Sequence, residues 1–148
     1  MTKGLFKFTN FYDMKITGTI VRSDDKYYQI ISDDEILNHC FGGYGYSVAE
    51  AKADFMTSIR EAKEMIVEDG YDIPKEAENI EVEFRYDIPS FFNYFDWINI
   101  SAFAKKAGIN ESKMRAYKAG VATASEKTLT KIFSTVKAMG AELSAATL

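Results

Sequence analysis

CFGGYGYSVAEAKADFMTSIREA, residues 40–62, joins a glycine-rich run to the clearest helix of the chain. Ser47 can cap this helix, and Glu50, three residues later, completes a capping box. The apolar residues that follow keep helical spacing, which predicts one buried stripe on an amphipathic helix that Gly70 ends. The stripe consists of Ala51, Phe55, Ile59, Ala62 and Ile66. The run from Cys40 to Tyr46 favours a strand or bulged edge that another backbone approaches closely.

Strand patterns lie on both sides of this segment. Residues 15–32, KITGTIVRSDDKYYQIIS, predict a hairpin of two β-branched and aromatic runs around a polar turn. Residues 80–88, IEVEFRYDI, alternate apolar and charged side chains, which is typical of a strand with one wet face. We therefore expect residues 1–88 to form a βββαβ module, an antiparallel sheet with one helix on its apolar face. Before the hairpin, an additional edge strand is suggested by Phe6, Phe8 and Phe11.

Pro89 and Ser90 mark a boundary, and the next residues are unusually aromatic. SFFNYFDWI, residues 90–98, contains five aromatic side chains, several at helical spacing. A short linker helix over 89–98 is predicted. So dense a cluster needs burial, which favours an interdomain or dimer core over a ligand site.

The last part of the chain, 99–148, predicts an all-α helix-turn-helix domain. Asn99 can cap a helix through Ala107, Gly108 supplies the tight turn, and Asn110 caps a second helix that stops at Gly120. A third helix is expected from Ser125 through Met139, closed by Gly140. The residues expected to pack the first two helices are Ala104, Ile109, Met114 and Tyr117. The third helix is expected to bury Leu129, Ile132, Phe133 and Val136.

Composition and charge narrow the function classes. The chain has 148 residues, a net charge of −4 and one cysteine, so a disulfide framework is excluded. Cys40 is expected to be a buried small hydrophobe, in a protein of the reducing cytoplasm. Residues 1–96 hold 10 Lys/Arg and 19 Asp/Glu, whereas residues 97–148 hold 8 Lys/Arg and 3 Asp/Glu. One acidic and one basic module suggest two different partners. No signal peptide or membrane span is expected.

The sequence offers no credible catalytic residue, metal site or cofactor site. His39 is the only histidine, too few for a zinc site, and is expected to lie in a loop. Asp24 and Asp25, like Asp33, Asp34 and Glu35, fall in turns, where Asp is favoured for local backbone hydrogen bonds. We therefore expect a protein that is not an enzyme. A metal-dependent nuclease using Asp24, Asp33 or Asp34 is a disfavoured alternative.

The second helix of the helix-turn-helix is the part of the sequence that predicts DNA binding. Once the core positions are removed, its outward polar residues can reach base edges or phosphates of a DNA major groove, and three lysines elsewhere can flank the phosphate backbone. An ordinary solvated helix face is the alternative. The helix contributes Ser112, Lys113, Arg115 and Lys118, and the flanking lysines are Lys105, Lys106 and Lys127.

Three stretches of the chain resemble the HicB-family antitoxins of type II toxin-antitoxin systems. They are KITGTIVRSDDKYYQI, CFGGYGYSVAEAKADFMTSIREA and GINESKMRAYKAGVATASEKTLTKI, and the resemblance that they carry spans roughly residues 14–148. The last is similar to an Xre/Cro-like helix-turn-helix. The resemblance implies a partial RNase H-like fold without its catalytic carboxylates, followed by a DNA-binding domain.

The resemblance also implies partners. A HicB-like domain binds a small HicA-type mRNA interferase and blocks its active surface, and an acidic module suits a basic, RNA-binding toxin. The DNA-binding domains, brought together in a dimer or tetramer, would bind operator DNA and repress the protein's own operon. The candidate toxin contacts are Phe41, Tyr44 and Tyr46, and a place in the core is the alternative for each. The alternative is a stand-alone repressor whose βββαβ module senses a small ligand.

Overall fold

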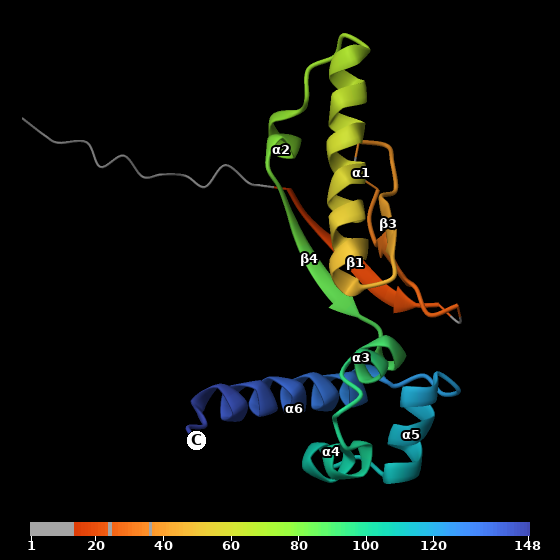
Figure 1. The fold of residues 1–148 in the computed structure, drawn as a ribbon, viewed down its shortest axis with the longest axis vertical. Coiled ribbons are helices and arrows are strands. Elements are labelled where there is room, and N and C mark those ends of the chain that lie inside the picture. The colour runs from red at the N-terminus through yellow and green to blue at the C-terminus, as the bar shows by residue number, and fades with distance from the viewer. Residues whose placement is uncertain (1–13, 24, 36) are drawn as a thin grey trace, which may run out of the picture. The chain divides into compact units, whose positions relative to one another are not determined.

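The computed structural model describes residues 14–23, 25–35 and 37–148. Over these residues the fold is α+β, as expected, with a four-stranded mixed sheet and six helices (Figure 1). The chain divides into two compact units, the first ending at Tyr86 and the second comprising Asp87–Leu148. The suggested edge strand around Phe6, Phe8 and Phe11 lies outside the described residues, as does Asp24.

The first unit contains the whole sheet, in the strand order β3-β2-β1-β4. Its elements are β1 (Met14–Arg22), β2 (Tyr28–Ser32), β3 (Gly42–Gly45), α1 (Val48–Glu68), α2 (Lys75–Glu78) and β4 (Ile80–Tyr86). The short helix α2 was not predicted. The antiparallel sheet expected from the sequence is wrong in one pairing, because β4 runs parallel to β1. Helix α1 returns the chain across the sheet, so β4 starts at the end where β1 starts, and alternation of side chains does not encode strand direction.

The core of the first unit lies between the sheet and α1. Ile16, Ile20 and Ile30 from the strands are at most 1% exposed, and they meet Phe55 of α1, which is fully buried. Burying side chains of this size contributes roughly 1.5–3 kcal/mol each. The second half of the predicted stripe is only half-buried, as Ala62 and Ile66 show.

Helix α1 approaches the backbone of β3 so closely that side chains are excluded there, as the glycine-rich run predicts. A Cβ on Gly43 would overlap the carbonyl oxygen of Ala51 and the nitrogen of Phe55, and would lie 2.7 Å from the Cα of Phe55. A Cβ on Gly45 would lie 2.6 Å from the nitrogen of Ala51. The two glycines therefore let the helix rest on the strand itself.

The second unit is built from four helices around its own core. They are α3 (Ile88–Tyr94), α4 (Ile100–Ala107), α5 (Glu111–Ala119) and α6 (Glu126–Ala145). The core consists of Phe92, Phe103, Ala104, Ala107, Met114 and Ile132. The aromatic segment expected as a linker forms α3, and its Phe92 ring packs edge to face on Phe103 at 4.9 Å.

Several local predictions need correction. Phe133 is 52% exposed rather than part of the core. Gly140 does not close the last helix, which continues to Ala145, because a glycine weakens a helix without requiring a break. Cys40 is exposed, and its neighbour Phe41 is buried in the core instead. No helix in the described ranges is long and apolar enough to cross a membrane.

The contact between α1 and β3 generates a stability prediction. Gly43→Ala should destabilise the protein by roughly 1–3 kcal/mol, because the added methyl group meets rigid backbone rather than a mobile side chain. The measurement is urea unfolding followed by circular dichroism. Gly140→Ala is the matched control: it lies inside α6 with nothing within 4 Å of the added carbon, and it should stabilise by about 0.5–1 kcal/mol. An equal change in the free energy of unfolding for the two variants would contradict the close approach of α1 to β3.

Candidate nucleic-acid interface

Side-chain caps and left-handed glycines position α4 and α5. The Oδ1 atom of Asn99 accepts from the backbone N–H of Ala102 at 2.9 Å, and that of Asn110 accepts from Lys113 at 3.2 Å. Gly108, between the helices, has a φ of 66°, a conformation that glycine adopts without strain. The turn and both helix starts agree with the boundaries predicted from the sequence.

Packing decides which face of α5 is free. Met114 is fully buried in the core of the second unit, and Tyr117 packs partly buried against it. As a consequence, the predicted outward residues Ser112, Lys113 and Arg115 are exposed, and Lys118, the fourth, is half-exposed.

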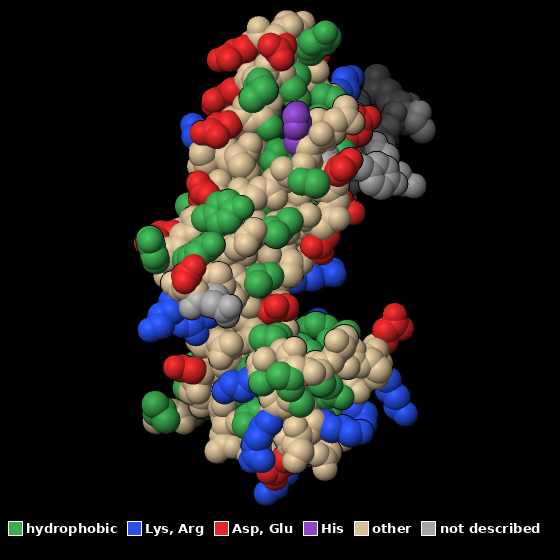
Figure 2. Space-filling model, turned by 90° about the vertical axis from the view of Figure 1, so that its right-hand side faces the viewer, with side chains coloured by type: hydrophobic (Ala, Val, Ile, Leu, Met, Phe, Trp, Pro, Cys, Tyr) green, Lys and Arg blue, Asp and Glu red, His purple; other side chains and the backbone are tan. Residues whose placement is uncertain are grey.

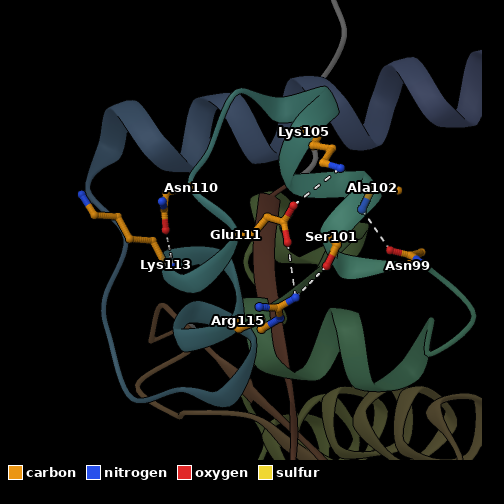
Figure 3. Close-up of polar contacts among 8 residues, drawn as sticks. All are labelled: Asn99, Ser101, Ala102, Lys105, Asn110, Glu111, Lys113 and Arg115. Atoms are coloured by element: carbon orange, nitrogen blue, oxygen red, sulfur yellow. Dashed lines mark hydrogen bonds and ion pairs between the residues drawn. The ribbon is translucent and has the colours of Figure 1, made fainter.

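Arg115 joins the two helices (Figure 3). Its Nη2 atom donates to the Oγ of Ser101 on α4 at 2.8 Å, and to Oε2 of Glu111, one turn earlier on α5, at 3.3 Å. The other carboxylate oxygen of Glu111 lies 3.8 Å from the Nζ of Lys105 on α4. We call these four residues, Ser101, Lys105, Glu111 and Arg115, the Arg115 cluster. It brings together two of the predicted basic residues, one from each helix.

Glu111 and Ser101 were missed as members of this site. The four-residue spacing between Glu111 and Arg115 is the signal for their ion pair, since side chains at i and i+4 are neighbours on a helix. Ser101 gives no such signal, because its contact depends on how α4 crosses α5. Both ion pairs of Glu111 are exposed and contribute little stability, roughly 0–1 kcal/mol. The hydrogen bonds to Ser101 and Glu111 place the Arg115 guanidinium between α4 and α5.

The remaining predicted lysines do not join this cluster. Lys106 pairs with Glu142 of α6 at 3.0 Å, and Lys127 is exposed in the first turn of α6. Adjacent residues on a helix point about 100° apart, so Lys105 and Lys106 face different neighbours. Figure 2 shows Lys and Arg side chains gathered on the second unit, whereas Asp and Glu predominate over the first.

The three aromatic residues proposed as protein contacts in the first unit differ in exposure. Phe41 is 3% exposed and belongs to the core, whereas Tyr44 is 54% and Tyr46 is 83% exposed. The Tyr44 ring lies 6.4 Å from that of Tyr27, and its hydroxyl accepts from Gln29 at 3.4 Å. Of these three residues, Tyr44 and Tyr46 therefore present exposed aromatic rings, whereas Phe41 does not.

The acidic and histidine candidates do not assemble a metal site in the described part of the chain. Asp33 accepts a hydrogen bond from the hydroxyl of Thr19 on β1 at 2.8 Å, a side-chain contact rather than the local backbone hydrogen bond expected of a turn residue. His39 and Asp34 are exposed. Among the described residues, no group of three His, Cys, Asp or Glu side chains is placed to hold a metal ion.

Comparison with protein-family models, with curated proteins and with solved structures found no match to this chain.

The caps generate a second stability prediction. Asn110→Ala should destabilise the second unit by roughly 0.5–2 kcal/mol, because the backbone N–H of Lys113 loses its acceptor. The measurement is urea unfolding followed by the fluorescence of Trp97, the single tryptophan. Ser112→Ala, an exposed change in the same turn, should stay within about 0.5 kcal/mol. Comparable losses in both variants would show that the cap does not position α5.

Proposed function

We propose that this chain is an antitoxin of the HicB kind, which neutralises a HicA-type mRNA interferase and represses its own operon. The first unit would be a partial RNase H-like toxin-binding domain. The second would be an Xre/Cro-like helix-turn-helix that binds operator DNA. The protein would act in the cytoplasm without catalysis or cofactor, as a dimer or tetramer.

The observation that carries the DNA-binding part is the outward face of α5. Lys113 and Arg115 are exposed on the two flanks of α5, each about 100° around the helix from the buried Met114. Arginine and lysine pair with guanine edges and with phosphates, and a capped helix of this kind enters a major groove by its N-terminal part. The basic surface of the second unit supplies the attraction to DNA that does not depend on sequence.

The toxin-binding part is supported by the resemblance and by charge. The described first unit follows the βββαβ order expected from the sequence pattern, with the short α2 added before β4, and α1 packs on the sheet. A ribonuclease that binds RNA presents a basic surface, and an acidic unit attracts it.

Identification of the partner tests the proposal. The tagged chain is purified at low salt from the cell that encodes it, and the intact masses of co-eluting proteins are measured. We expect a stoichiometric small basic protein that is toxic when expressed alone and harmless with this chain. A chain that elutes only with itself and still binds its promoter would overturn the antitoxin proposal in favour of a ligand-sensing repressor.

A paired substitution separates the two activities. Lys113→Ala with Arg115→Ala should weaken binding to the promoter of its own operon by roughly 10- to 100-fold, because each side chain is expected to contribute a base or phosphate contact. Toxin neutralisation in a growth assay should not change. The measurement is DNA binding at fixed salt concentration.

Arg60→Ala with Lys75→Ala is the control, since it removes the same charge from the first unit. If the paired variant lost both activities, the units would not have separate roles. If it lost neither, α5 would not be the DNA-binding helix.

A further inference from the structure

One of the few acidic side chains in the last third of the sequence lies within the Arg115 cluster. Residues 97–148 contain three carboxylates: Glu111 in the first turn of α5, Glu126 in the first turn of α6, and Glu142 near the end of α6. The start of α5 is already capped by the side chain of Asn110. Helix capping therefore does not account for a carboxylate at Glu111, on the helix expected to meet DNA.

The Glu111 carboxylate contacts a cation from each of two helices (Figure 3). Its Oε2 atom accepts a hydrogen bond from Arg115 on α5 at 3.3 Å, and its Oε1 atom lies 3.8 Å from the Nζ of Lys105 on α4. The Glu111 side chain is 37% exposed, whereas that of Lys105 is 77% and that of Arg115 is 57% exposed. Both cations therefore remain accessible to a larger anion while the carboxylate holds them.

These ion pairs oppose contact with phosphate. DNA of unrelated sequence attracts a protein through its phosphates alone. When Lys105 or Arg115 moves to a phosphate, it exchanges one anionic partner for another, so the net attraction is smaller than for a cation without a carboxylate beside it. Exposed ion pairs are weak, so a duplex can displace Glu111, but at a loss of affinity.

We propose that Glu111 competes with DNA phosphate for Lys105 and Arg115, and so weakens binding of the second unit to DNA of unrelated sequence. The inference rests on the proposed DNA binding and adds to it a residue that opposes that binding. A repressor benefits from such a residue, because the unrelated sites of a genome greatly outnumber its operator and compete for it.

Replacement of Glu111 tests the proposal on the full chain with two duplexes, one of unrelated sequence and one carrying the promoter of its own operon. Glu111→Gln should tighten binding to the unrelated duplex by roughly three- to tenfold at fixed salt concentration, because two exposed ion pairs no longer have to be broken. Glu126→Gln is the matched control, since it removes the same charge from the first turn of α6. It should change the affinity by less than about twofold, because salt screens an exposed charge.

A second comparison separates release of the cations from simple repulsion between Glu111 and phosphate. In a chain with Lys105→Ala and Arg115→Ala, the Glu111 carboxylate has lost both of these cations. Simple repulsion then predicts that Glu111→Gln tightens binding at least as much as it does in the native chain. The proposal predicts a gain within about twofold, because neither cation remains to be released. Urea unfolding of each variant verifies that it is folded.

Equal effects of Glu111→Gln and Glu126→Gln, or an undiminished gain in the doubly substituted chain, would overturn the proposal and leave DNA binding intact. If neither the native chain nor Glu111→Gln bound either duplex, the DNA-binding part of the proposed function and this inference would both be rejected. If the gain appeared while the native chain did not prefer its own promoter, Glu111 would keep its role and the proposed repressor function would be rejected.

Discussion

The contact between α1 and the backbone of β3 is the constraint on which the first unit depends. Because Gly43 and Gly45 have no side chains, the helix lies directly on the strand. The carboxylates of Asp54 and Glu50 on α1 then accept hydrogen bonds from the backbone N–H groups of Tyr44 and Tyr46. This position of α1 favours one side of the sheet. Because α1 packs mainly on β3 and β2, the core-facing residues of β4, such as Val82 and Phe84, stay half-buried.

Different forces fix the second unit. Its helices α4 and α5 have eight and nine residues, and isolated helices of this length are marginal in water. Asparagine caps and left-handed glycines define where α4 and α5 start and stop, and burial of Met114 against Phe92 and its neighbours fixes which face turns outward. Arg115 then adds a polar link from α5 to α4. The exposed polar face of α5 is thus a consequence of core packing.

Local sequence signals predicted most elements, because caps, turn glycines and apolar periodicity act over a few residues. They located α1, α4 and α5 and the strands of the first unit. They did not give the direction of β4, which depends on the path of the chain across the sheet. Phe133 was misplaced because its neighbour Ile132 faces the core of the second unit, and adjacent residues on a helix point about 100° apart. Within the candidate site, α5 was predictable, whereas the link between Arg115 and Ser101 required the crossing of two helices.

Glu111 sets the chemical character of the candidate interface. A carboxylate in the first turn of a helix is favoured by the helix dipole, yet on a DNA-facing surface it repels phosphate. Here it engages both Lys105 and Arg115, so two of the basic groups are partly neutralised in the free protein. Binding of a polyanion would have to compete with these ion pairs, which are weak because they are exposed. A carboxylate also accepts a hydrogen bond from the amino group of cytosine. If α5 binds DNA as proposed, Glu111 would disfavour contact with phosphate alone and would favour a base that offers such a donor, and so discrimination between DNA sequences over general affinity.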